Sequence, residues 1–226
     1  MSHPKDHSHQ HDGEHDHDHD HEHDHAPIES PQEPTGTLRY LEQALRELLN
    51  EKGIITAAQI AQQIDLQDSR TPALGSKVVA RAWTNAEFKQ ALLANPLEAI
   101  NETFGLTITT PLELVVLENK PNLHNMVVCT LCSCYPRMLL GIPPAWYKST
   151  DYRSRVVVEP RAVLREFGTQ VPITTEVRVA DSTADVRYLV LPLRPAGTEG
   201  FTEDQLAALV TRDTMIGTAL PQFEQA

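Results

Sequence analysis

The sequence has few cysteines, few aromatic residues and no long apolar run. Only 3 of its 226 residues are cysteine, and 5% are aromatic. No stretch of about 18 apolar residues occurs, so we expect no membrane-spanning helix. The odd cysteine count and the lack of an apolar signal segment lead us to expect a cytoplasmic, reducing location, where thiols are available to metal ions.

Basic residues are also scarce, since 19 Lys and Arg stand against 31 Asp and Glu for a net charge of −12 at pH 7. The imbalance is local. Residues 1–34 contain ten acidic groups and one lysine, a balance of −9 that leaves −3 for the remainder. Neither part has the basic stripe typical of nucleic-acid binders. We therefore expect neither a nucleic acid nor a membrane as a partner.

Histidine is concentrated at the N-terminus, where the tract from His3 to His25 holds ten of the eleven histidines, mostly alternating with Asp or Glu. The tract carries many charges of the same sign and has no apolar side chains that could form a core, so we expect it to be disordered. Imidazole binds Ni, Co, Zn and Cu ions, which favours weak metal buffering. A solvated acidic tail without a specific role is the alternative. A proline-rich linker completes residues 1–36.

We expect one domain at residues 37–226, divided into a helical arm at 37–106 and a metal-binding α+β core at 107–226. The arm begins with leucines at helical spacing, namely Leu38, Leu41, Leu45 and Leu48, before Gly53. Two further helices are predicted in the arm at Thr56–Gln63 and Leu74–Trp83. A third contains Phe88 and Leu92; a Thr84–Glu87 capping box begins it and Pro96 ends it. Gly105 closes one more helical turn.

The pattern changes after Ile108. Strands are predicted at Leu112–Leu117 and Asn125–Val128, and a pair of strands at Glu176–Ala180 and Val186–Leu193. Helices are predicted at Pro144–Tyr147, at Pro160–Phe167 and after Thr202, which forms a cap with Gln205. The predicted fold class is α+β, with a helical N-terminal arm followed by a layered α-β-β-α-like core and preceded by the His/Asp-rich tail.

All three cysteines lie in one heptapeptide, Cys129-Thr130-Leu131-Cys132-Ser133-Cys134-Tyr135. Three thiols within six positions cannot form a disulfide framework that links distant segments. Thiolates are soft ligands for transition metals, and the C-x-x-C-S-C spacing brings the sulfurs together through a tight turn. A tetrahedral zinc site would need a fourth ligand that is not adjacent. The alternative is three buried, inert thiols, but the density of the motif favours a metal site.

The stretch from Val128 to Pro136 resembles the metal-binding motif of nitrile hydratase α-subunits and of the related cobalt-bearing subunit of thiocyanate hydrolase. The resemblance extends over roughly residues 38–221. Beyond the motif it includes L-H-N-M at 123–126, G-I-P-P-A-W-Y-K at 141–148, R-P-A-G-T-E-G-F-T-E at 194–203 and V-T-R-D at 210–213. Such broad coverage makes a chance match to the motif implausible.

The resemblance implies a low-spin Co(III) or Fe(III) ion bound by the sulfurs of Cys129, Cys132 and Cys134 and by the backbone nitrogens of Ser133 and Cys134. A sixth position is left for water or substrate. The resemblance also implies that Cys132 is a sulfinate and Cys134 a sulfenate, and that Cys132, Ser133 and Cys134 are the catalytic residues. Thr130 stands where iron-type members usually have serine, which favours cobalt.

The resemblance further implies an activity and partners. The activity is hydration of a small-molecule nitrile to an amide, with the ion acting as a Lewis acid. The partner is a β subunit that supplies arginines to the oxidised sulfurs, in a heterodimer or heterotetramer. A cobalt-inserting activator protein is a second expected partner.

Three other residues bear on the site. Arg137 and Thr110 are candidate pocket residues. Arg137 stands where nitrile hydratases typically have tryptophan and is more similar to thiocyanate hydrolase, where an arginine near the pocket would favour an anion; Thr110 stands where many nitrile hydratases have glutamine. Leu117–Asn119 and His124–Met126 are closer to nitrile hydratase, which we favour. His124, the one histidine after the tail, is a candidate ligand, but such a histidine is more often a donor that orients a ligand or a hydrogen-bonded core residue.

Two other functions remain open at this point. One is a cobalt subunit of a thiocyanate hydrolase, which would use the same machinery on an anion. The other, of a different class, is a non-catalytic metal-storage protein in which the tail and the cysteines are both storage sites. The length of the resemblance argues against storage.

Overall fold

The computed structural model describes residues 36–108, 110–132 and 134–223. The predicted disorder and metal buffering of the His/Asp-rich tail lie outside the described residues, and so does every role predicted for Ser133. The division of the folded part at residue 106 stays a prediction.

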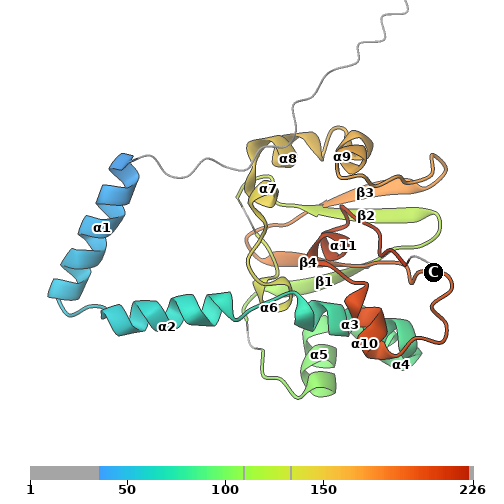
Figure 1. Ribbon diagram of the computed structural model, residues 1–226, viewed down its shortest axis with the longest axis horizontal. Coiled ribbons are helices and arrows are strands. Elements are labelled where there is room, and N and C mark those ends of the chain that lie inside the picture. The colour runs from blue at the N-terminus through green and yellow to red at the C-terminus, as the bar shows by residue number, and fades with distance from the viewer. Residues whose placement is uncertain (1–35, 109, 133, 224–226) are drawn as a thin grey trace, which may run out of the picture.

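The N-terminal helices α1 (Gly36–Glu51) and α2 (Ala57–Asp68) extend away from the rest of the chain (Figure 1). Thr56, where the second helix was predicted to begin, caps α2 and forms a capping box with Gln59. The predicted leucine stripe lies on α1 but neither helix has a buried residue, and Leu41 is 64% exposed. The stripe is therefore not part of this chain's own core.

The next three helices, α3 (Ala73–Thr84), α4 (Ala86–Ala94) and α5 (Pro96–Phe104), do bury apolar faces in the core. The predicted Thr84–Glu87 capping box is wrong. Thr84 is the last residue of α3 and its hydroxyl donates to carbonyls within that helix. Asn85 has the extended backbone that a cap requires, and its side chain accepts from the Phe88 N–H at 2.8 Å. Pro96 begins α5, and Gly105 ends it in the left-handed conformation.

In the part of the chain that the structure describes, four strands form two parallel pairs. Strand β1 (Glu113–Glu118) pairs with β4 (Val186–Leu191), and β2 (Leu123–Val128) pairs with β3 (Glu176–Asp181). The strands were predicted, but the expected pairing of the last two with each other is wrong. Residue propensity and burial predict that a segment is a strand, but they do not predict which strand it pairs with. Here β3 pairs with β2, and β4 pairs with β1.

The remaining helices are short: α6 (Arg137–Leu140), α7 (Ala145–Lys148), α8 (Thr150–Arg155), α9 (Pro160–Glu166), α10 (Glu203–Ala208) and α11 (Arg212–Ile216). Thr202 and Gln205 form the predicted cap of α10, but α11 follows it and is the last helix. Helices α6, α8 and α11 were missed because four to six residues are too few to show a helical period.

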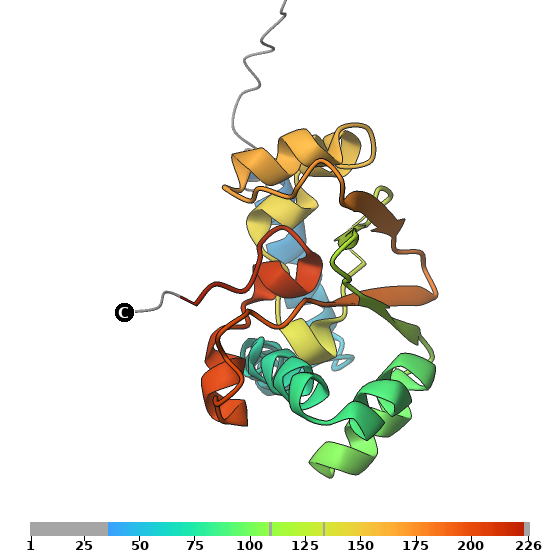
Figure 2. The ribbon, with the colours of Figure 1, turned by 90° about the vertical axis from the view of Figure 1, so that its right-hand side faces the viewer.

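The strands lie between helices in both views of the molecule. Helices α8 and α9 lie above the strands, and α3, α4, α5 and α10 lie below them (Figures 1 and 2). Buried residues of the strands and of the helices on both sides form one apolar cluster. The predicted α+β class with a layered core is confirmed. Within the described ranges, no helix combines the length and apolarity needed to cross a membrane.

Candidate metal centre

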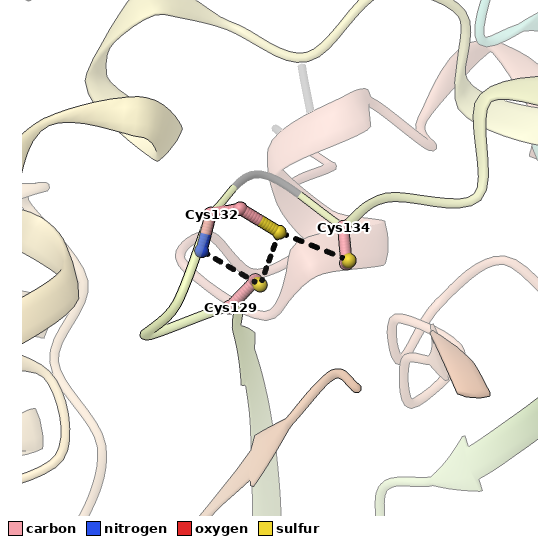
Figure 3. A group of neighbouring side chains, drawn as sticks. All are labelled: Cys129, Cys132 and Cys134. Atoms are coloured by element: carbon pink, nitrogen blue, oxygen red, sulfur yellow. Dashed lines mark hydrogen bonds between the residues drawn. The ribbon is translucent and has the colours of Figure 1, made fainter. Parts of the chain in front are cut away.

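The three cysteines follow directly from β2 and turn their sulfurs toward one another (Figure 3). Cys129 is the residue after the strand and is fully buried, whereas Cys132 is exposed and Cys134 is half-buried. The Sγ atoms of Cys129 and Cys132 are 3.4 Å apart, and those of Cys132 and Cys134 are 3.2 Å apart. All three sulfurs lie within 4.8 Å of one another, so one ion could contact them all.

The donor set limits the kind of ion that fits the site. Three cysteine sulfurs are soft ligands, which suit a transition ion rather than magnesium or calcium.

Hydrogen bonds from several elements fix the backbone of the cysteine loop. Asp181, the last residue of β3, accepts from the Thr130 N–H at 2.9 Å and from its hydroxyl at 2.5 Å. The Tyr147 hydroxyl donates to the Cys134 carbonyl at 3.0 Å. One guanidinium nitrogen of Arg153 lies 3.4 Å from both the Thr130 and the Cys132 carbonyls. The loop is thus tied to β3, α7 and α8.

Burial and neighbouring thiols raise the pKa of Cys134. Desolvation, and then hydrogen bonding with Cys132 and Cys129, raises the pKa of the Cys134 thiol to about 12, while the nearby Arg187 acts in the opposite direction. Metal ligation requires thiolates, so an entering cation must displace protons. Metal binding to this site therefore releases protons.

His124 lies on β2 and is buried. The Asn119 side-chain amide approaches its Nδ1 atom at 3.3 Å, and its Nε2 atom donates to the Gly217 carbonyl at 2.7 Å. Burial is the main cause that lowers its pKa. These contacts tie β2 to the end of α11. A role of His124 in orienting a metal ligand stays a prediction.

A cavity of about 700 Å³ adjoins the cysteine loop. Its lining includes Cys132 and Cys134 and both predicted pocket residues, Arg137 and Thr110. Sequence reasoning missed Arg70 and Arg187, which also line it, and Arg153, which bonds the loop. Arg70 and Arg187 are distant from the cysteines in sequence, so no local pattern could have indicated them.

Comparison with known proteins identifies the family. The sequence profile described as nitrile hydratase, alpha chain, matches residues 37–219. The chain belongs to this family. It is 51% identical over 179 residues to the low-molecular weight cobalt-containing nitrile hydratase subunit alpha of Rhodococcus rhodochrous, covering 79% of this chain and 86% of that protein. It is 44% identical over 200 residues to thiocyanate hydrolase subunit gamma of Thiobacillus thioparus, covering 84% and 82%.

Solved structures of nitrile hydratase relatives share the fold. A double mutant of the Fe-type nitrile hydratase from Comamonas testosteroni Ni1 has a TM-score of 0.77 and 41% identity, with 84% of this chain and 92% of that chain covered. The chain is thus similar both to a cobalt-containing relative, at 51% identity, and to an Fe-type relative, at 41% identity. Together with the sulfur cluster, this supports a metal site at Cys129, Cys132 and Cys134.

Proposed function

We propose that this chain is the metal-bearing α subunit of a nitrile hydratase, a hydro-lyase that converts nitriles to amides. The observation that carries the proposal is the convergence of three sulfurs at 3.4 and 3.2 Å within a chain of the nitrile hydratase alpha family. Cys129, Cys132 and Cys134 are the proposed ligands, with the backbone nitrogens of Ser133 and Cys134. Cys132, Ser133 and Cys134 are the proposed catalytic residues.

Co(III) is the proposed ion, with Fe(III) as the alternative. Support for cobalt comes from relatives named as cobalt-containing and from Thr130 in the cysteine loop. When bound, the ion supplies Lewis acidity that polarises the nitrile and activates water. Oxidation of Cys132 to a sulfinate and of Cys134 to a sulfenate is part of the proposal, because oxidised sulfurs donate less electron density than thiolates.

The chain's own residues hold and shape the site. Cys129 anchors the loop in the core, while Cys132 and Cys134 are open to the cavity in which a substrate would lie. Asp181 and Arg153 hold opposite polar groups of the loop, the N–H and the carbonyl of Thr130. These hydrogen bonds hold the backbone of the cysteine loop in one conformation before the ion and the substrate bind. The metal ligands are therefore preorganised.

A β subunit is the proposed partner, in a heterodimer or heterotetramer, and a cobalt-inserting activator protein a second one. The chain belongs to a family of alpha chains, which supports a β subunit as its partner. The exposed leucines of α1 supply an apolar face for it, because apolar surface of this kind is normally covered by a partner. The cytoplasm is the proposed location, supported by the odd cysteine count.

A second candidate function is hydrolysis of thiocyanate. Arg137 lies on the cavity beside Cys132 and Cys134, where its permanent charge would favour an anion. The similarity to a thiocyanate hydrolase subunit covers 84% of this chain at 44% identity, against 79% at 51% identity for a cobalt-containing nitrile hydratase subunit.

Activity of the complex purified with its partner subunit tests the proposal. We expect amide formation from a panel of nitriles and a visible sulfur-to-metal charge-transfer band. Consumption of thiocyanate with no amide formation would assign the second function. A colourless, zinc-loaded and inactive protein would instead support metal storage.

A further inference from the structure

Three arginines from separate parts of the chain line the cavity beside the cysteine loop. Arg70 lies in the loop between α2 and α3, Arg137 begins α6, and Arg187 lies on β4. No aspartate or glutamate is found among the described residues that line this cavity. A neutral nitrile has no group that would need three positive charges.

Arg187 is fixed in place by its own turn. Its Nη1 atom donates to the backbone carbonyls of Thr183, Ala184 and Val186. Its Nε and Nη2 atoms make no hydrogen bond to a described residue, so they remain available to a ligand. Arg187 lines the same cavity as Cys132 and Cys134, which places it beside the cysteine loop.

The backbone of Arg70 is held at the cavity by a close approach to Gly141. A Cβ atom on Gly141 would lie 2.3 Å from the Arg70 carbonyl oxygen, and Gly141 has φ +72°. Only glycine lets these two backbones meet in this way. The guanidinium of Arg70, like that of Arg137, forms no ion pair with the described part of the chain.

Arginine stays charged at all relevant pH values and presents a fork of donors that fits carboxylates. Charges of one sign around a concave surface raise the local concentration of an oppositely charged ligand. We propose that Arg70 and Arg187, together with Arg137, form a subsite for a small anion, so that the preferred substrate carries a negative charge remote from the reacting carbon. The proposal rests on the proposed hydratase function, and the anionic group itself does not react.

A matched pair of nitriles tests the subsite. Butyronitrile and 3-cyanopropanoate differ by a methyl group against a carboxylate. For the metal-loaded complex with its partner subunit, we expect kcat/KM to favour 3-cyanopropanoate. The ratio of the two kcat/KM values should fall about fivefold or more in Arg70→Gln and change by less than about twofold in Arg70→Lys, which keeps the charge. It should also fall as the ionic strength is raised.

Arg165→Gln is the control, because Arg165 lies on α9 and does not line this cavity. It should leave the ratio unchanged. A preference of the wild-type complex for butyronitrile, or a ratio that is the same in Arg70→Gln as in wild type, would overturn the subsite.

The unreactive products separate this proposal from the hydratase function. Isothermal titration of succinamate and butyramide measures binding without turnover. Tighter binding of succinamate that Arg70→Gln abolishes supports the subsite even if neither nitrile is hydrated, a result that would contradict only the hydratase function. Equal binding of the two amides overturns the subsite. If the complex turned over thiocyanate and showed no preference for 3-cyanopropanoate, the three arginines would bind the reacting inorganic anion. That outcome would also overturn the subsite.

Discussion

Replacing Gly141 by alanine should destabilise the protein at the point where α6 meets the loop before α3. The residue has φ +72° and ψ −149°, a backbone region open almost only to glycine, which costs an alanine about 1–3 kcal/mol. The new Cβ would also lie 2.3 Å from the Arg70 carbonyl oxygen and 3.2 Å from the Thr71 Cα. Overpacking of this kind adds about 1–3 kcal/mol, so we expect a total loss of about 2–6 kcal/mol.

Gly168→Ala is the control for positive φ. Gly168 has φ +75°, but no atom lies within 4 Å of a Cβ built on it. It therefore carries only the conformational cost of about 1–3 kcal/mol. At about 2–4 °C per kcal/mol for a chain of this size, calorimetry should show Tm falling by about 4–24 °C for Gly141→Ala and about 2–12 °C for the control.

The comparison is made on the complex at one scan rate, because unfolding of assemblies is often irreversible. Equal losses of Tm in the two variants would refute the reasoning, since they would mean that the contact between Gly141 and Arg70 adds nothing. A larger loss in Gly141→Ala should be accompanied by a lower preference for 3-cyanopropanoate, because the clash displaces Arg70 from the cavity.

Three further predictions concern the site and its supports. Asp181→Asn should weaken cobalt retention against a chelator about fivefold, because the variant loses charge-assisted hydrogen bonds to Thr130 at an exposed site. The control Asp185→Asn, at another exposed aspartate, should retain cobalt as the wild type does. Equal retention in both variants would contradict the role of Asp181. Arg137→Trp should raise kcat/KM on a bulky nitrile relative to thiocyanate, and an unchanged ratio would remove Arg137 from specificity. The pKa of His124 is lowered from 6.5, mainly by burial, so the unfolded chain binds its proton more tightly. Stability should therefore fall as pH drops below about 6.5, and Tm between pH 7 and pH 5 should decline less steeply in His124→Gln; identical slopes would count against this linkage.

Much of the local structure could be predicted from the sequence, because its signals are local. The helix start at Thr56 and the cap formed by Thr202 and Gln205 depend on residues a few positions apart, and both predictions are confirmed. The strand leading to Cys129 follows from an apolar run beside the motif. The prediction of Thr84 as the cap of α4 was wrong. Which residue caps this helix depends on where the preceding helix ends, and packing decides that position.

The pairing of strands and the far side of the cavity could not be predicted in this way. Strand β4 lies next to β1, about 70 residues earlier in the chain, and nothing in either segment encodes the other. Arg70 and Arg187 reach the cavity for the same reason, through contacts between distant segments. The cysteine cluster was predictable because all its sulfurs come from one heptapeptide, in which a single tight turn brings them together.

X-ray absorption at the cobalt edge, with metal analysis of the serine variants, tests the central claim most directly. For the complex purified with its partner subunit, the account predicts a cobalt ion with sulfur neighbours at about 2.3 Å. It also predicts loss of cobalt in Cys129→Ser, Cys132→Ser and Cys134→Ser, because a hard hydroxyl replaces a soft sulfur poorly. A full cobalt complement in any of these variants, or a cobalt shell without sulfur, would contradict the account.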